Sequence, residues 1–206
     1  APPVSSPSPL VRTDAGDVEG LVLPSGVRAW LGVPFAQPPV QARRWQEAQP
    51  IRGTGTYHAD RKMPACIQVL RPHDINHYFG EEATSEDCLY MNIWAPGNSA
   101  PSSRLPVIVF LHGGGGTVGS SGMANYDGAE VARRGAVYVN FNYRLGILGF
   151  KAHPELTREQ GGHSGNDCTR APESAQPPPG GGAIRRFALP VISLKSACLA
   201  VSCHRN

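Results

Sequence analysis

The sequence lacks long apolar runs and clusters of basic residues. Its 206 residues include no uninterrupted apolar run of the ~18 residues that a membrane-spanning helix needs. The 19 Lys and Arg are scattered against 16 Asp and Glu, and no basic run is longer than a pair. We therefore expect a soluble protein with no membrane span and no nucleic-acid partner. Composition does not predict the oligomeric state.

The sequence has five cysteines, an odd number, so they do not pair up completely. Cys66 and Cys88 flank a polar, loop-like segment, and a disulfide between them would stabilise the fold by about 3 kcal/mol. Such a bond implies an oxidising compartment. The first residues, APPVSSPSPL, would suit a mature N-terminus left by a secretory signal. We therefore expect a secreted or periplasmic protein. The alternative for Cys66 and Cys88 is two unpaired buried thiols.

The pattern of apolar residues predicts an α/β protein. VEGLVL and VRAWLGV, in residues 17–34, predict a hairpin around a Pro-Ser-Gly turn, and residues 36–85 predict irregular structure. Residues 88–94, 105–112 and 136–143 predict strands. Before the last of these lies a short helix that Asp127 can cap and Gly135 can end. Strand, glycine loop, helix and strand form a crossover of a parallel sheet, and ligands bind at the carboxyl end of such strands.

The loop LHGGGGTVGSS (111–121) allows three interpretations. Its GGGTVG fits a dinucleotide fingerprint, but the next strand ends in Asn and Tyr without the acidic residue that would bind a ribose, and no Gly-Lys-Ser/Thr follows for a P-loop. We expect no cofactor and no metal. The second interpretation is an oxyanion hole, in which glycines let backbone N–H groups approach a substrate oxygen, as in the HGGG loop of lipases and esterases. The third is a tight turn without chemistry.

Four ordered motifs resemble the type-B carboxylesterase and cholinesterase family. They are SEDCLYMNIWAP (85–96), LPVIVFLHGGGG (105–116), NYRLGILGF (142–150) and SGN (164–166), with GVPFAQPP (32–39) before them. The resemblance covers about residues 11–166. The sequence of residues 66–88 is most similar to that of secreted bacterial para-nitrobenzyl-type esterases. It implies the N-terminal part of an α/β-hydrolase fold, with a mostly parallel central sheet and an N-terminal hairpin.

The resemblance also implies roles for individual residues. Cys66 and Cys88 match the N-terminal disulfide of the family. Gly114 and Gly115 match the catalytic residues whose amides face the substrate carbonyl oxygen, and Gly116 stands where the family usually has an aromatic residue. His112 braces the loop.

Charged residues and the other histidines receive structural roles. The charged residues of the family motifs are candidates for buried ion pairs: Glu86, Asp87 and Arg144. The remaining histidines lie in polar loops and are expected to be exposed: His58, His73, His77, His153 and His163.

The family's nucleophile motif is missing. No G-x-S-x-G occurs in the 206 residues. Ser196 stands near the expected separation from the glycine loop, but Leu194 and Cys198 replace the flanking glycines, and only His204 follows it. Resemblance stops at Asn166, so residues 167–206 form a divergent Pro- and Gly-rich tail, either disordered or produced by a reading-frame shift in a truncated gene product. Residues 1–10 are a Pro- and Ser-rich segment, and residues 11–166 are a partial family domain.

Two functions follow from the resemblance. The first is a carboxylic ester hydrolase acting on a small-molecule ester, of which this chain holds the oxyanion loop and has very low activity of its own. The second is a cholinesterase-like binding or adhesion protein that has lost its catalytic triad. The sequence does not reveal the acyl or alcohol group that the site prefers.

Overall fold

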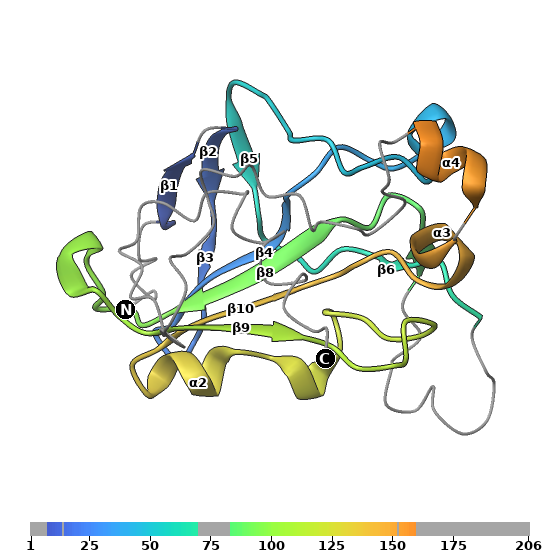
Figure 1. Ribbon diagram of the computed structural model, residues 1–206. Helices are drawn as coiled ribbons and strands as arrows, with labels where there is room; N and C mark the ends of the chain where they lie inside the picture. The colour runs from blue at the N-terminus through green and yellow to red at the C-terminus, as the bar shows by residue number, and fades with distance from the viewer. Residues whose placement is uncertain (1–7, 14, 70–82, 152, 160–206) are drawn as a thin grey trace, which may run out of the picture.

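The computed structural model describes residues 8–13, 15–69, 83–151 and 153–159 (Figure 1). The described strands form a five-stranded central sheet in the order β3-β4-β8-β10-β9, a three-stranded sheet β1-β2-β5 and a two-stranded sheet β6-β7. The strands are β1 (Leu10–Thr13), β2 (Gly16–Glu19), β3 (Leu21–Val22), β4 (Arg28–Pro34), β5 (Thr56–His58), β6 (Ala65–Cys66), β7 (Thr84–Ser85), β8 (Tyr90–Ala95), β9 (Val107–Leu111) and β10 (Val137–Phe141). The α-helices are α2 (Ala129–Arg133), α3 (Gly146–Phe150) and α4 (Pro154–Glu159), and 3-10 turns cover Gln41–Arg43, Pro101–Ser103 and Ala124–Tyr126.

The predicted crossover is present at one edge of the central sheet. β9 leads through the glycine loop and α2 into β10, which pairs with β9 in parallel, from Val137 opposite Val107 to Phe141 opposite Leu111. β10 pairs with β8, β8 with β4 and β4 with β3 in antiparallel fashion. In the described part of the chain the sheet is therefore mixed. Its parallel pair brings the carboxyl ends of β9 and β10 together.

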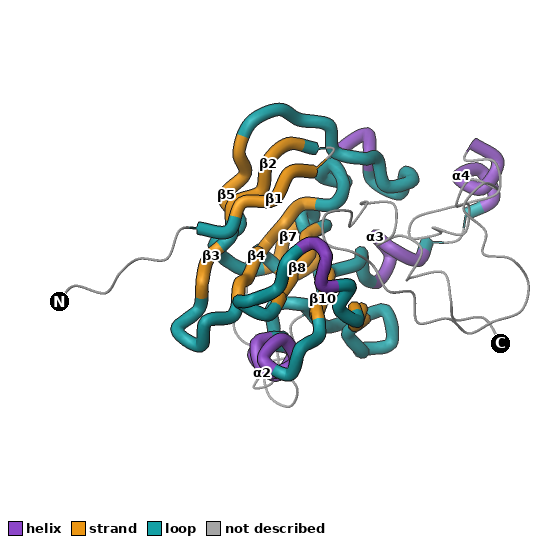
Figure 2. Tube along the Cα trace, turned by 90° about the vertical axis from the view of Figure 1, so that its left-hand side faces the viewer, coloured by secondary structure: helices purple, strands orange, loops and turns teal. Residues whose placement is uncertain are grey.

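Each face of the central sheet carries its own core. On one face α2 packs against Trp94 and Tyr138, and a Cβ on Gly128, just before the helix, would lie 2.3 Å from the Tyr138 ring. On the other face Val18 of β2 packs with residues such as Trp30 and Phe141. Figure 2 shows α2 and the β1-β2-β5 sheet on opposite sides of the central strands. Both faces are thus covered over the middle of the sheet.

The helix before β10 begins and ends as predicted. The Asp127 carboxylate accepts a hydrogen bond from the Ala129 amide at 2.9 Å, which satisfies one of the free donors at the start of α2. Gly135 has a φ of 93°, a left-handed conformation that ends the helix and leads into β10.

The N-terminal hairpin is confirmed only in part. β3 and β4 pair around a turn in which the Gly26 amide donates to the Leu23 carbonyl at 2.8 Å. The prediction that residues 18–23 form one strand is wrong, because the strand is interrupted at Gly20. The part before it, β2, pairs with β1 and β5 in a separate sheet. A Cβ at position 20 would lie 2.3 Å from the Ala29 carbonyl oxygen. The chain therefore passes so close to β4 at this point that only glycine fits.

The predicted disulfide between Cys66 and Cys88 is confirmed. The two Cα atoms are 5.0 Å apart, and both cysteines are buried. The bond joins the end of β6 to the segment before β8, and the short parallel pair of β6 with β7 lies beside it. Two parts of the chain that are otherwise irregular are thereby fixed to the central sheet.

The charged residues of the family motifs differ in how deeply they are buried. Glu86 pairs with Arg44 at 2.8 Å, but both side chains remain partly exposed. Arg144 is buried and donates to the Gln46 carbonyl at 2.9 Å. Burial, with a hydrogen bond to Asp87, raises the pKa of Tyr90 well above its ordinary value. These charged residues thus hold loops against the central sheet through several partners.

No helix in the described ranges combines the length and the hydropathy needed to cross a bilayer.

Loss of the disulfide is expected to destabilise the protein. The bond closes a loop of 22 residues, so the double variant Cys66→Ser/Cys88→Ser should lose about 3 kcal/mol of unfolding free energy in the chain-entropy model. Urea unfolding of the 206-residue chain, followed by tryptophan fluorescence, measures this loss. A reducing agent should lower the midpoint of the wild type and leave that of the double variant unchanged. Equal sensitivity of the two proteins would contradict the assignment.

Candidate oxyanion-binding site

The glycine loop leaves the carboxyl end of β9, beside the carboxyl end of β10 (Figure 1). Its backbone has φ values of 126° at Gly114, 62° at Gly115 and 70° at Gly116. Residues with a side chain rarely adopt such values, so three successive positions favour glycine. A Cβ on Gly114 would also lie 1.8 Å from the Val118 carbonyl oxygen. The run of glycines in the sequence is therefore required by the path of the chain.

The turn is closed around one carbonyl group. The Gly114 oxygen accepts hydrogen bonds from the Thr117 amide at 3.1 Å, the Val118 amide at 3.2 Å and the Thr117 hydroxyl at 3.0 Å. The Gly116 oxygen accepts from the Gly146 amide, at the start of α3, at 2.7 Å. The loop carbonyls are thus engaged by the loop itself and by α3.

The amides of the loop are less engaged than its carbonyls. Among the described residues, no acceptor receives a hydrogen bond from the amide of Gly114 or of Gly115. Gly115 is exposed and Gly114 is half-buried. An amide without a protein acceptor can donate to water or to a ligand. The sequence predicts these two donors as site residues, and within the described ranges neither has a protein acceptor.

An open pocket of about 450 Å³ lies beside the loop. Three residues of the loop line it, Gly115, Gly116 and Thr117, whereas Gly114 does not. The other lining residues belong to α3 or to the residues beside it: Tyr143, Gly146, Ile147, Phe150 and Lys151. A Cβ on Gly116 would lie 3.0 Å from the Phe150 ring. An aromatic ring therefore stands next to position 116 although the loop itself supplies none.

His112 lies under the loop and contacts it directly. Its ring is buried and stacks on Tyr143, with 4.4 Å between centroids and 14° between planes. Nδ1 lies 3.0 Å from the Gly113 carbonyl oxygen, an acceptor, so Nδ1 carries the proton. The Tyr143 hydroxyl donates to the His112 carbonyl at 2.9 Å. These are the contacts of a residue that braces the loop from within.

The environment of His112 disfavours its charged form. Burial lowers its pKa below the ordinary value of 6.5, against the smaller opposing effect of the hydrogen bond to Gly113. Nε2 is buried and has no hydrogen-bond partner among the described residues. A proton on Nε2 would therefore place an unpaired charged donor in the interior.

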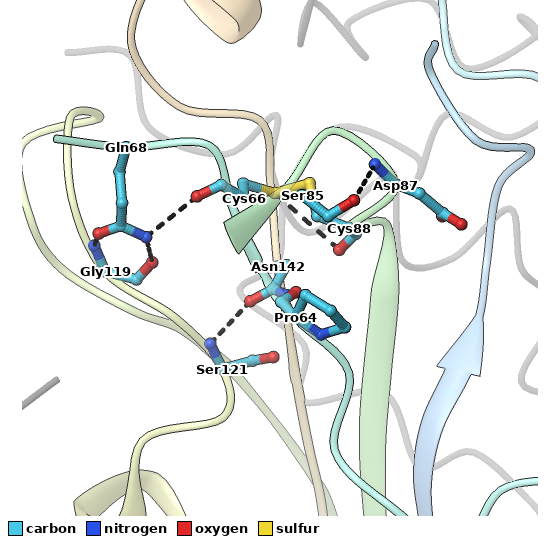
Figure 3. The surroundings of a disulfide bond; sticks show 9 residues. All are labelled: Pro64, Cys66, Gln68, Ser85, Asp87, Cys88, Gly119, Ser121 and Asn142. Atoms are coloured by element: carbon cyan, nitrogen blue, oxygen red, sulfur yellow. Dashed lines mark hydrogen bonds between the residues drawn. A yellow bond between two sulfur atoms is a disulfide. The ribbon is translucent and has the colours of Figure 1, made fainter. Parts of the chain in front are cut away.

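Several polar residues hold the C-terminal half of the glycine loop, near Ser121, and were not predicted from the sequence. Asn142 accepts from the Ser121 amide at 2.8 Å and donates to the Pro64 carbonyl at 3.1 Å (Figure 3). Asn92 of β8 donates to Asn140 of β10 at 2.9 Å. Asparagine is depleted in strands, so these three residues within YMNIW and VYVNFN were a signal of a buried hydrogen-bond network.

Two of the other predicted residues lie within the described ranges. His58 and His153 are exposed, as expected, and His58 lies 2.7 Å from Glu19. Ser196, His204 and the SGN motif lie outside the described residues, as do His73, His77 and His163.

Comparison with known proteins identifies the family. The model of the carboxylesterase family matches residues 7–166. The chain belongs to this family. It is 46% identical over 160 residues to a fumonisin B1 esterase of Sphingopyxis macrogoltabida, covering 76% of this chain and 28% of the relative. It is 39% identical over 158 residues to an acetylcholinesterase of Gallus gallus, covering 70% of this chain and 20% of the relative.

Solved structures of similar sequence show the same fold. A thermophilic PNB esterase superposes with a TM-score of 0.65 at 34% identity, covering 76% of this chain and 31% of that one. EstA of Aspergillus niger gives a TM-score of 0.64 at 31% identity, covering 75% and 29%. The described part of the chain therefore has the predicted α/β-hydrolase architecture. The chain matches less than a third of the length of these relatives.

Acid should destabilise the protein through His112. Because burial lowers its folded-state pKa, the unfolded chain binds a proton below pH 6.5 that the folded protein does not bind. Unfolding free energy should therefore fall as the pH is lowered from 7 to 5, by up to about 1.4 kcal/mol per pH unit. Urea unfolding across this range should give a shallower slope for His112→Gln than for the wild type. The control His153→Gln changes an exposed residue and should keep the wild-type slope, whereas equal slopes for all three proteins would contradict the assignment.

Proposed function

We propose that this chain forms the oxyanion-binding part of a serine carboxylic-ester hydrolase. The observation on which this depends is the pair of amides at Gly114 and Gly115, which donate to no acceptor among the described residues. Of the two residues, Gly115 lines the open pocket. Membership of the carboxylesterase family supports the reaction class. The named relatives, a fumonisin B1 esterase and an acetylcholinesterase, support a small-molecule ester as substrate.

The chemistry assigns the amides a role in the transition state. A serine oxygen attacks the ester carbonyl carbon, and the carbonyl oxygen becomes negative as a tetrahedral intermediate forms. The Gly114 and Gly115 amides donate hydrogen bonds to that oxygen. The intermediate then expels the alcohol, and water releases the acid by a second addition and elimination. One such donor typically contributes about 3 kcal/mol of transition-state stabilisation.

The pocket walls favour an apolar group next to the reacting carbonyl. Ile147 and Phe150 line the pocket and expose 68% and 56% of their surface, although both are large apolar residues. An alkyl or aryl substituent of the ester would bury this surface. The disulfide between Cys66 and Cys88 supports action in an oxidising compartment, secreted or periplasmic.

Binding of a tetrahedral anion tests the proposal. n-Butylphosphonate resembles the intermediate, with anionic oxygens and an alkyl chain, and should shift the Gly114 and Gly115 amide signals in ¹H–¹⁵N NMR spectra of the wild-type chain. Gly114→Ala places a methyl group 1.8 Å from the Val118 oxygen, so the turn must move and affinity should fall at least tenfold. Gly55→Ala is a matched control, since Gly55 has a similar φ of 110° and nothing within 4 Å of its Cβ. If the wild-type chain is folded and its Gly114 and Gly115 amide signals do not shift when the anion is added, the proposal is ruled out.

The chain alone is expected to turn over esters very slowly. No G-x-S-x-G motif occurs in its 206 residues, and the strained turn of that motif is what exposes a catalytic serine. Incubation with p-nitrophenyl butyrate should give no release of nitrophenol above the buffer rate, and a fluorophosphonate probe should not label the chain. Rapid turnover with labelling at Ser196 would contradict this expectation.

A further inference from the structure

The far end of the glycine loop is held by a side chain from the disulfide segment. The Gln68 amide nitrogen donates to the Gly119 carbonyl at 2.9 Å, and the Gly119 amide donates to the Gln68 side-chain oxygen at 2.9 Å (Figure 3). One side chain therefore satisfies both polar backbone groups of Gly119. The two residues are 51 positions apart, so the contact joins segments that are distant in sequence.

Gly119 also leaves no room for a side chain where it faces His112. Its φ is 121°, and a Cβ there would lie 2.3 Å from Nδ1 of His112 and 2.6 Å from the Gly113 carbonyl oxygen. Gly119 is itself buried. The residue is thus clamped between the imidazole ring of His112 and the side-chain amide of Gln68, and the start and end of the loop meet at this point.

Gln68 is in turn fixed by the disulfide segment. Its amide nitrogen also donates to the carbonyl of Cys66 at 3.1 Å, and Cys66 is bonded to Cys88. Its neighbours Ile67 and Val69 are exposed, whereas Gln68 is half-buried and directed at the loop. Within residues 67–69, Gln68 is thus the residue whose side chain contacts Gly119.

We propose that Gln68 is a positioning residue for the oxyanion loop, and that the disulfide holds it in place. By fixing Gly119 against His112, Gln68 keeps the turn closed and the Gly114 and Gly115 amides directed away from protein acceptors. Gln68 does not line the pocket, so it acts through the loop and not on the substrate. This role in ester hydrolysis rests on the proposed function, but the clamp on Gly119 does not.

The variant Gln68→Glu tests the proposal. It keeps the size of the side chain and the acceptor for the Gly119 amide, but it replaces the donor with a carboxylate oxygen facing the Gly119 carbonyl. Repulsion between these two oxygens should separate the side chain from Gly119 and break both hydrogen bonds. At pH 7 we therefore expect the Gly119 amide to exchange with deuterium at least tenfold faster, the Gly113–Gly116 amide signals to shift, and the affinity for n-butylphosphonate to fall about tenfold. Gln37→Glu is the control, because the Gln37 amide donates to the Pro50 carbonyl at an exposed site, and it should leave all three unchanged.

The outcomes separate this proposal from the proposed function. If the wild type fails to bind n-butylphosphonate, the proposed function fails, and exchange at Gly119 alone then decides whether Gln68 holds the loop. Unchanged Gly119 exchange and unchanged loop signals in folded Gln68→Glu would overturn the positioning role. Should Gln68→Glu not fold, Gln68→Met removes both hydrogen bonds without adding charge, and the same expectations apply to it.

Discussion

The site depends on a backbone path that only glycine adopts readily. Between Gly114 and Gly119 four residues have φ between 62° and 126°, and at Gly114 and Gly119 the space that a Cβ would need is already filled by protein atoms. Turning the chain in this way gathers carbonyls into internal hydrogen bonds, and it leaves the amides of Gly114 and Gly115 without acceptors in the part of the protein that the structure describes. Such an arrangement costs conformational entropy, since glycine loses more freedom on folding than any other residue. The surroundings of the loop must therefore supply the stabilisation.

Three contacts of different chemical kinds stabilise the glycine loop. The stacked rings of His112 and Tyr143 form an apolar base, the Gly146 amide at the start of α3 binds the outer turn, and Gln68 fixes the end of the loop. Tyr143 and Gly146 come from the segment after β10 and Gln68 comes from the segment after β6, and the central sheet and the disulfide set their relative positions. A site that works through backbone dipoles needs such rigidity, because its donors must already be in place when charge develops on the substrate.

The sequence predicted the parts of the fold that local patterns determine. The strands around residues 90–95, 107–111 and 137–141, the helix after Asp127 and the loop were all evident from apolar runs and glycines, because each pattern is contained within a few residues. The Cys66–Cys88 pairing followed from the family resemblance. The break at Gly20 was not predicted, because it is caused by close contact with β4, which no local pattern records. The contact of Gln68 with the loop was not predicted either. A single glutamine indicates no contact until the fold brings its partner, 51 residues away, beside it.

The most direct test of the account is a crystal structure of the chain grown with n-butylphosphonate. The account predicts a phosphonate oxygen about 3 Å from the amide nitrogens of Gly114 and Gly115, a normal hydrogen-bond length, with the butyl chain against Phe150. A structure in which those two amides donate to carbonyl groups of the protein, with the phosphonate bound elsewhere or absent, would contradict it.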